Sequence, residues 1–412
     1  MSPVPLPALP DFRPCLRDGV AEFPVHHVRG GTSTGLVLAE RLAPADPALR
    51  EELLRHLMGV PLQGRRPGNR QITGLGRGPA TSNKVFFAEV ETVDGRPRLV
   101  STLAQLAAEH GGIDWSVNCG NLSAALPLWA LDAGLALRQA DDGALAIDIR
   151  NTNTGVLTTA RVRRDAAGRY ASAEIPGVDG HFPAVDLFLH DPVGAKTGRL
   201  LPTGRARDEI EGHAVSCVDV AVPMVIADAA GFGKTAQEPI AALEADPAFM
   251  AALRRVWVAA GLRMGLKRRD GQPMSEAELE RSETVPKVCI VGPPQGAGAL
   301  AVRYFTPQGG HASLAVSGGC CLAAASLVPG TVAQQLARGL RAPAAAWGEI
   351  EVGLENPAGL LEATVVARAV GDGIEVRSAA YRRSAQILLR GQVPLYRASA
   401  ALQQALLGGP AG

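Results

Sequence analysis

The sequence has few aromatic residues and no excess of charge of either sign. Aromatic residues make up 4% of the 412 residues, the formal net charge is +1, and no block of like charge exceeds four residues. Proteins that bind nucleic acid use basic patches, and those that bind single strands add aromatic rings on which bases stack. We therefore expect no nucleic-acid partner and no attraction to an anionic membrane surface.

Signals for metal binding, disulfides, export and membrane insertion are also missing. The six cysteines include no C-x-x-C pair, and no pair of histidines has zinc spacing. We expect no metal site, reduced thiols and a cytoplasmic protein. The first residues, "MSPVPLPALPDF", lack the basic and apolar regions of a signal peptide, and no apolar run reaches the ~20 residues that span a bilayer. Small molecules inside the cell are then the expected partners.

A nucleotide-binding loop is excluded by its spacing. "GFGKT" (231–235) follows an apolar strand-like run, as the end of a P-loop would. The first glycine of G-x-x-x-x-G-K-[ST] would fall at Asp228, so the pattern fails.

Two segments rich in small residues suggest an internal repeat. "NCGNLSAALPLWALDAG" (118–134) and "VSGGCCLAAASLVPG" (316–330) each place Gly and Cys near the start, followed by Ala and Leu on every face. A helix that is apolar all round must be buried. The length also favours two domains. We predict two similar halves, each a sheet curled round a central helix, with the two helix starts near one another.

Local signals predict further elements. "APADPALREELLRHLMG" (43–59) is expected to be a helix with an acidic start and Gly59 as its stop. The segment 360–393 is expected to form two strands and a helix.

The start of a buried helix is suited to an anion. It leaves backbone N–H groups unpaired, glycine lets a ligand approach them, and the positive end of the helix dipole favours negative charge. The same field favours the thiolate form of Cys119. We expect carboxylates to be held at both helix starts, by Gly120, Asn121 and Leu122 and by Gly318 and Gly319. The alternative is a small buried cysteine beside an ordinary Asn cap.

A set of short motifs in a fixed order resembles the PrpF family, which has the diaminopimelate-epimerase-like fold. Together they cover roughly residues 23–396. The matching stretches are "RGGTSTG" (29–35), "TSNKV" (81–85), "DWSVNCGN" (114–121), "NTNTG" (151–155), "LLPTG" (200–204), "GLRMGL" (261–266), "VPKVCIV" (285–291), "SGGCCLAAASLVPGT" (317–331) and "YRRSAQILLRGQV" (381–393).

The resemblance implies an α+β fold of two epimerase-like domains related by a pseudo-twofold, with the active cleft between them. We place the first domain at 23–187 plus 375–396 and the second at 188–374, with tails at 1–22 and 397–412. The sequence does not decide the oligomeric state, and a homodimer is one assembly that we consider.

The resemblance also implies an activity. The family includes 2-methylaconitate cis–trans isomerase, 3-methylitaconate isomerase and 4-oxalomesaconate tautomerase, which act without a cofactor on unsaturated di- or tricarboxylates. The residues that match its acid–base candidates are Lys84 and Cys119. Removing a proton next to such an alkene creates an extended enolate, which fixed N–H groups and cations must stabilise. The substrate-binding residues that we expect are Arg29, Thr32, Ser33, Ser82, Gly120, Asn121, His311, Ser317 and Gly318.

Two positions depart from the family pattern. The family commonly has lysine where Thr34 stands, and relatives commonly have Asn where Val222 stands. Both departures weaken the transfer of a substrate from any one relative, so the sequence leaves open which unsaturated polycarboxylate is used.

Two other functions stay open at this point. A two-cysteine amino-acid racemase or epimerase would need a second thiol facing Cys119, for which Cys320 and Cys321 are the candidates, although we favour core packing for at least one of them. A non-catalytic accessory protein to an iron–sulfur hydratase would bind the same acids without converting them.

Overall fold

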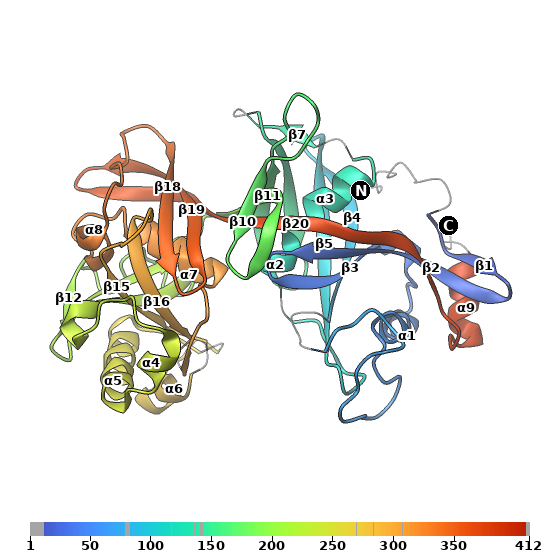
Figure 1. Cartoon of the computed structure of the whole chain (residues 1–412), viewed down its shortest axis with the longest axis horizontal. Coiled ribbons are helices and arrows are strands. Elements are labelled where there is room, and N and C mark those ends of the chain that lie inside the picture. Colours follow the sequence, from blue (N-terminus) through green and yellow to red (C-terminus); the bar gives the residue numbers. More distant parts are fainter. Residues whose placement is uncertain are drawn as a thin grey trace. The chain divides into compact units, whose positions relative to one another are not determined.

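The structure is a computed structural model that describes residues 12–78, 83–116, 118–135, 137–140, 143–268, 270–282, 284–306 and 308–408. The chain divides into two compact units (Figure 1). Unit 1 comprises Met1–Glu174, Gly180–Leu187 and Arg383–Gly412, and unit 2 comprises Ile175–Asp179 and Phe188–Arg382. Two long strands, β11 (Val178–His190) and β20 (Gly373–Pro394), contribute residues to both units.

Unit 1 combines strands with short helices. Its other elements are β1 (Cys15–Arg17), β2 (Val20–Gly30), β3 (Ser33–Ala39), α1 (Pro47–Met58), β4 (Lys84–Val93), β5 (Arg96–Leu106), β6 (Ile113–Asp114), α2 (Gly120–Ser123), α3 (Leu126–Asp132), β7 (Arg138–Gln139), β8 (Leu145–Asn151), β9 (Leu157–Val162), β10 (Ser172–Ile175) and α9 (Ala400–Leu407).

The strands of unit 1 form a closed circuit. β2 pairs with β3 antiparallel, β3 with β4 parallel, β4 with β5 antiparallel, β5 with β8 parallel and β8 with β9 antiparallel. Pairings of β9 with β11, β11 with β20 and β20 with β2 complete it. Inward-facing side chains of these strands pack on apolar residues of α2 and α3, among them Leu122, Leu126 and Trp129. The sheet therefore curls round this helical segment.

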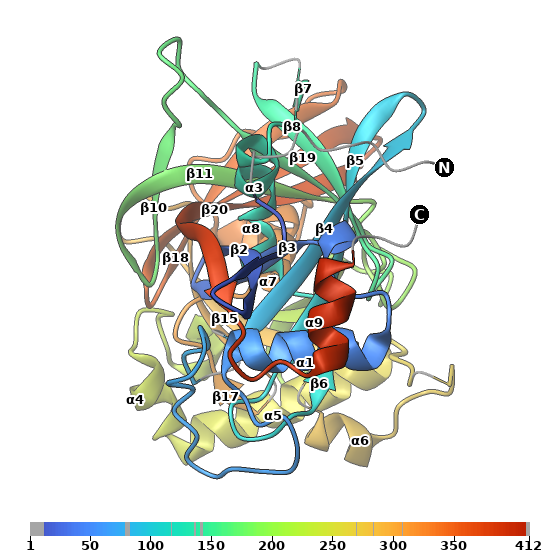
Figure 2. The same cartoon turned by 90° about the vertical axis from the view of Figure 1, so that its right-hand side faces the viewer.

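The outer face of the same sheet is covered by α1 and α9, which lie side by side (Figure 2). Asp46 caps the start of α1 by accepting hydrogen bonds from two backbone N–H groups, and Pro47 occupies its first position. The helix ends at Gly59, whose φ of 67° is left-handed. The helix predicted over 43–59 and its stop at Gly59 are confirmed.

Unit 2 has its own sheet and helices. Its elements are β12 (Asp208–Ile210), β13 (His213–Val220), β14 (Val222–Asp228), α4 (Ile240–Glu244), α5 (Pro247–Arg263), α6 (Glu276–Arg281), β15 (Lys287–Gly292), β16 (Leu300–Thr306), β17 (Gly309–Gly310), α7 (Val316–Ala325), α8 (Val332–Leu336), β18 (Gly348–Asn356) and β19 (Gly359–Val370).

The centre of unit 2 is α7, which packs against β13, β14, β18 and β19 (Figure 1). Every residue of this helix from Gly318 to Ala325 is buried, as a helix that is apolar on all sides requires. The outer face carries α5, whose Leu253, Val256 and Trp257 join a second apolar cluster. The expected α+β fold, with a sheet curled round a central helix in each half, is confirmed.

One predicted element differs. The segment 360–393 was expected to end in a helix, but it forms β19 and the 22-residue strand β20. The cause is tertiary pairing, since β20 pairs with β19 along its first part and with β2 along its second.

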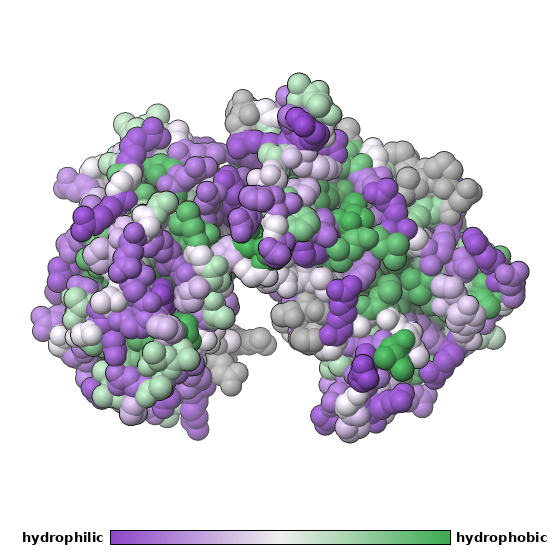
Figure 3. All heavy atoms as spheres, viewed as in Figure 1, coloured by the Kyte–Doolittle hydropathy of each residue, from purple (hydrophilic) through white to green (hydrophobic). Residues whose placement is uncertain are grey.

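The described surface mixes polar and apolar side chains (Figure 3). Exposed large apolar residues include Leu388 and Leu389 on β20, and Ile72 and Tyr396 in loops. Nothing in the structure identifies an occupant for these side chains, so the homodimer stays a prediction. Within the described ranges, no helix is both long and apolar enough to cross a bilayer.

Candidate active site

Lys84, Cys119 and Ser33 meet inside unit 1. Lys84 Nζ lies 3.1 Å from Cys119 Sγ and 3.5 Å from Ser33 Oγ, and Ser33 Oγ lies 3.8 Å from Cys119 Sγ. Lys84 and Cys119 are each 8% exposed and Ser33 is 1% exposed. An amine and a thiol at hydrogen-bond distance and largely shielded from water make an acid–base pair.

The fold brings these three residues together from distant parts of the chain. Lys84 begins β4 and pairs with Gly35 of the parallel strand β3. Ser33 lies two residues before Gly35 and so points to the same face of the sheet. Cys119 is the N-cap of α2, where its sulfur accepts a hydrogen bond from Leu122 N at 3.4 Å.

Glycines allow the strands to approach α2 this closely. A Cβ on Gly30 would overlap the carbonyl oxygen of Asn121 and lie 2.8 Å from that of Leu122. A Cβ on Gly35 would lie 2.9 Å from Leu122 Cδ2 of α2 and would also overlap the carbonyl oxygen of Lys84 on β4. Neither glycine is among the substrate-binding residues expected from the sequence. The spacing of glycines in "RGGTSTG" was the available signal.

Asn121 and Thr32 border the acid–base pair. Asn121 Nδ2 donates to Thr32 Oγ1 at 3.3 Å, while the buried Asn121 Oδ1 accepts no hydrogen bond from the described part of the chain. Thr32 is exposed. The structure thus brings Thr32, Ser33, Asn121, Lys84 and Cys119 into one neighbourhood.

Arg29 anchors the turn that carries Thr32 and Ser33. Its Nη1 donates to the carbonyl oxygens of Gly31 at 2.9 Å and Ser384 at 3.0 Å, and its guanidinium lies 4.5 Å from the centre of the Phe182 ring. Burial lowers the pKa of Arg29. Only Nη2 is buried without a hydrogen-bond partner among the described residues. Most donors of the Arg29 guanidinium therefore bind groups of the protein itself, and contact between Arg29 and substrate stays a prediction.

The helix at Cys119 is shorter than its sequence predicts. Residues 120–132 form two pieces, α2 and α3, separated at Ala124 and Ala125. Pro127, which cannot donate a backbone hydrogen bond, stands at the start of α3. A four-residue helix supplies local N–H groups but little macrodipole. The helical segment expected after Cys119 is therefore present and buried, but it is divided into two short helices.

Three of the remaining predicted ligand residues belong to unit 2. Ser317 and Gly318 form the first turn of α7 in unit 2, where Gly318 is packed under the ring of Tyr304. His311 Nδ1 accepts a hydrogen bond from Ser313 N at 2.9 Å. Their part in substrate binding stays a prediction. Ser82 lies outside the described residues.

A second thiol at a helix start is missing from α7. Cys320 and Cys321 are fully buried in the core of unit 2, and burial raises the pKa of Cys321. The N-cap of α7 is Ala315. The expected core packing of at least one cysteine is confirmed. In the described part of the chain, no group of three or more His, Cys, Asp or Glu side chains could hold a metal ion.

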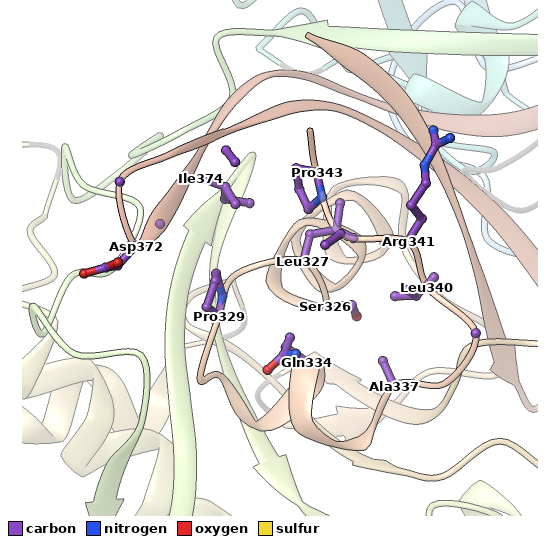
Figure 4. Close-up of a pocket in the computed structure, with 15 residues that line it drawn as sticks. Ser326, Leu327, Pro329, Gln334, Ala337, Leu340, Arg341, Pro343, Asp372 and Ile374 are labelled. Carbon is purple, nitrogen blue, oxygen red and sulfur yellow. The ribbon is translucent and has the colours of Figure 1, made fainter. Parts of the chain in front are cut away.

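Unit 2 also contains a cavity of about 300 Å³ beyond the C-terminal end of α7 (Figure 4). It is bordered by Leu327, Pro329, Leu340 and Ile374, and Figure 4 shows Asp372 pointing away from it. Its polar lining residues are Ser326, Gln334, Arg341 and Asp372, so it holds no pair of an amine and a thiol like that at Lys84.

Comparisons with known proteins agree on one family. The family model described as PrpF protein matches residues 20–396. The 4-oxalomesaconate tautomerase of Pseudomonas putida is 33% identical over 77% of this chain and 83% of its own length. The (4E)-oxalomesaconate Delta-isomerase of Novosphingobium sp. is 31% identical over 90% and 96%. A crystal structure of methylitaconate-delta-isomerase superposes with a TM-score of 0.76, at 26% identity, over 93% of this chain and 97% of its own.

Proposed function

The chain belongs to the PrpF family, and from this premise we propose that it moves a proton within an unsaturated di- or tricarboxylate. The family predicted from the ordered motifs is confirmed. Its named relatives are isomerases and tautomerases, and the chain is an enzyme of this class. The proposed substrates are acids like oxalomesaconate, methylitaconate or methylaconitate.

The proposal rests on one observation, the 3.1 Å contact between Lys84 Nζ and Cys119 Sγ. The two groups share a proton in either of two forms, ammonium with thiolate or amine with thiol. Each form contains one base and one acid, so one group can take up a proton while the other gives one up. The pair therefore supplies what a proton transfer needs without outside help.

In the proposed reaction, the base takes a proton from the carbon next to the activated double bond. The electron pair of the broken C–H bond spreads over the allylic system and its carboxylate as an extended enolate. The acid then returns a proton to another carbon or oxygen of the same system, so the product is an isomer and no group is lost. Lys84 is the principal acid–base residue, and Cys119 is its partner or an orienting group.

Carboxylate binding is assigned to the groups that border the pair. Thr32 and Ser33 offer hydroxyls, and the backbone N–H groups at Gly120 and Asn121 offer donors. Such donors stabilise developing negative charge most where water is excluded. No cofactor is part of this proposal.

The test is a screen by proton NMR in heavy water with 4-oxalomesaconate, 3-methylitaconate and 2-methylaconitate. We expect one of these acids to take up deuterium and change its bond pattern, and the Lys84→Met variant to lose most of this activity. Full activity in folded Lys84→Met would refute the role of the lysine. Absence of exchange with all three acids would point to a binding protein without turnover.

A two-cysteine racemase is the less favoured alternative. It would require a second thiol at the start of α7, where Ala315 stands and both nearby cysteines are buried. Deuterium uptake by a free amino acid, lost in both Cys119→Ser and Cys320→Ser, would favour it.

A further inference from the structure

Two buried amide side chains, those of Gln71 and Asn83, meet directly before Lys84 in the chain. Asn83 Nδ2 donates to Gln71 Oε1 at 3.0 Å, and Gln71 Nε2 donates to Asn83 Oδ1 at 3.0 Å. Gln71 is 1% exposed and Asn83 is 0% exposed. The two amides thus form a closed pair of reciprocal hydrogen bonds.

Backbone groups satisfy the rest of both amides. Asn83 Nδ2 also donates to Gly78 O at 3.1 Å, and Asn83 Oδ1 accepts from Arg77 N at 3.2 Å. Gln71 Nε2 donates to Met58 O at 2.8 Å, and Gln71 Oε1 accepts from Gly78 N at 2.7 Å. Because a backbone N–H only donates and a carbonyl only accepts, these bonds fix the orientation of each amide. A fully satisfied buried network of this kind is rigid.

The chain adopts an unfavourable backbone to build this pair. Gln71 has a φ of 54°, in the left-handed region that residues other than glycine seldom occupy. At Gly76, a Cβ would overlap Gln71 Nε2 and lie 2.6 Å from Asn83 Oδ1. Such costly conformations persist only where the surroundings impose them, and they are frequent at functional sites.

The pair and the lysine lie on opposite sides of the sheet. The Asn83 side chain is tied to the end of α1 through Gln71 and Met58 O, whereas Lys84 points to Cys119. The backbone between them is held by the hydrogen bond from Leu106 N to Asn83 O at 2.9 Å. An anchor on one face therefore sets the direction of the side chain on the other.

We propose that the Gln71–Asn83 amide pair is a positioning element that holds the Lys84 amine against the Cys119 sulfur. The proposal rests on the acid–base role given to Lys84 above. Misplacing a reacting group by about 1 Å lowers turnover by as much as 10²-fold. Loss of the pair should therefore lower kcat far more than it changes KM.

The test variant is Gln71→Met, which keeps the length of the side chain and removes its hydrogen bonds. The matched control is Asn69→Ala. Asn69 lies in the same loop. Its Nδ2 donates to Gly59 O at 2.9 Å and Ala108 O at 2.8 Å, and its Oδ1 accepts from Gln71 N at 3.3 Å. Asn69→Ala therefore removes backbone contacts of the loop but none of the hydrogen bonds of the Gln71–Asn83 amide pair. Both variants should lower the Tm. Only Gln71→Met should lower kcat, by up to about 10²-fold.

A second readout needs no substrate. It is the rate at which iodoacetamide alkylates Cys119 at pH 7, with Cys119→Ser as the blank for other thiols. Thiol reactivity depends on the groups beside the sulfur, so this rate reports whether Lys84 keeps its place 3.1 Å from Cys119 Sγ. We expect slower alkylation in Gln71→Met and an unchanged rate in Asn69→Ala. If Gln71→Met does not fold, Gln71→Asn replaces it, because it keeps an uncharged amide that tolerates the left-handed backbone but is one methylene too short to repeat the hydrogen bonds of the pair.

Equal kcat and equal alkylation rates in the Gln71 variant and in Asn69→Ala would overturn the proposal. If alkylation slows as expected but the unchanged protein converts none of the three acids, the positioning stands and the proposed reaction fails. If the acids are converted and the Gln71 variant behaves like its control in both readouts, the reaction stands and the positioning fails.

Discussion

The two units of the chain repeat one order of strand pairing. In unit 1, β2–β3 is antiparallel, β3–β4 parallel, β4–β5 antiparallel, β5–β8 parallel and β8–β9 antiparallel. In unit 2, β13–β14, β14–β15, β15–β16, β16–β18 and β18–β19 follow the same alternation. In each unit the buried helical segment lies between the fourth and fifth strands of this series. We interpret the two units as two copies of one internal repeat.

The two units also correspond at individual residue positions. Lys84 begins β4 opposite Gly35, the third residue of β3, and Lys287 begins β15 opposite Met224, the third residue of β14. The two lysines therefore hold equivalent places in their units.

The neighbours of the two lysines differ. Unit 1 has Cys119 at the helix N-cap and Ser33 two residues before the paired position, whereas unit 2 has Ala315 and Val222 at the corresponding places. The thiol and hydroxyl of unit 1 thus correspond to apolar side chains in unit 2. The fold thus supplies a position for a lysine in both units, and the two neighbouring side chains distinguish the proposed acid–base lysine from its counterpart.

The largest effect is expected from Lys84→Met. It removes one member of the proposed acid–base pair, and general acid–base groups contribute about 10²–10⁴-fold to rate. We expect kcat in the NMR exchange assay to fall by that order. Lys287→Met, at the equivalent place in unit 2, is the matched control. A comparable loss in both variants would show that the two lysines do not differ in role.

Cys119→Ser should have a smaller effect on turnover. A hydroxyl keeps the N-cap acceptor for Leu122 N but is a much weaker acid than a thiol, so we expect about a 10²-fold lower kcat with little change in Tm. A decrease below about tenfold would mean that Cys119 only orients Lys84, since proton transfer contributes more than that.

Mild acid should also lower the stability of unit 1 against unfolding. Burial lowers the pKa of His26, His27 and His56, with Asp132 partly opposing the shift at His26. The unfolded chain then binds more protons than the folded one, so stability is full above about pH 6.5 and is lost as the pH falls through the lowered values. Thermal unfolding between pH 7.5 and 5 measures this loss, and hydrogen exchange locates it. Earlier loss of protection in unit 2 would contradict it.

The smallest effect is expected from Lys287→Met by itself. Burial lowers the pKa of Lys287, which means that the folded state disfavours its ammonium form. A methionine removes that cost together with the contacts of the amine, so we expect only a small change in Tm and turnover close to that of the unchanged chain. A strong rise in KM would instead place Lys287 in substrate binding.

Local residues were sufficient to predict an element when the residues at its two ends set where it starts and stops. The start of α1 follows from Asp46 and Pro47 and its end from Gly59, all of which act within one turn of the helix. The same reasoning failed over β20, because the state of that segment depends on pairing with β19 and β2, strands far from each other in the chain. It also failed at residues 120–132, where Pro127 interrupts the expected helix.

By itself, the sequence determined the family, the α+β class, the burial of α7 and the presence of a lysine and a cysteine suited to proton transfer. Only the tertiary structure decided that Lys84 and Cys119, 35 residues apart, lie in contact. It also decided that Gln71 and Asn83 form a saturated pair behind the lysine. The physical reason is that hydrogen bonds between side chains depend on atomic positions that β-sheet register and helix packing set together, and no local pattern encodes these.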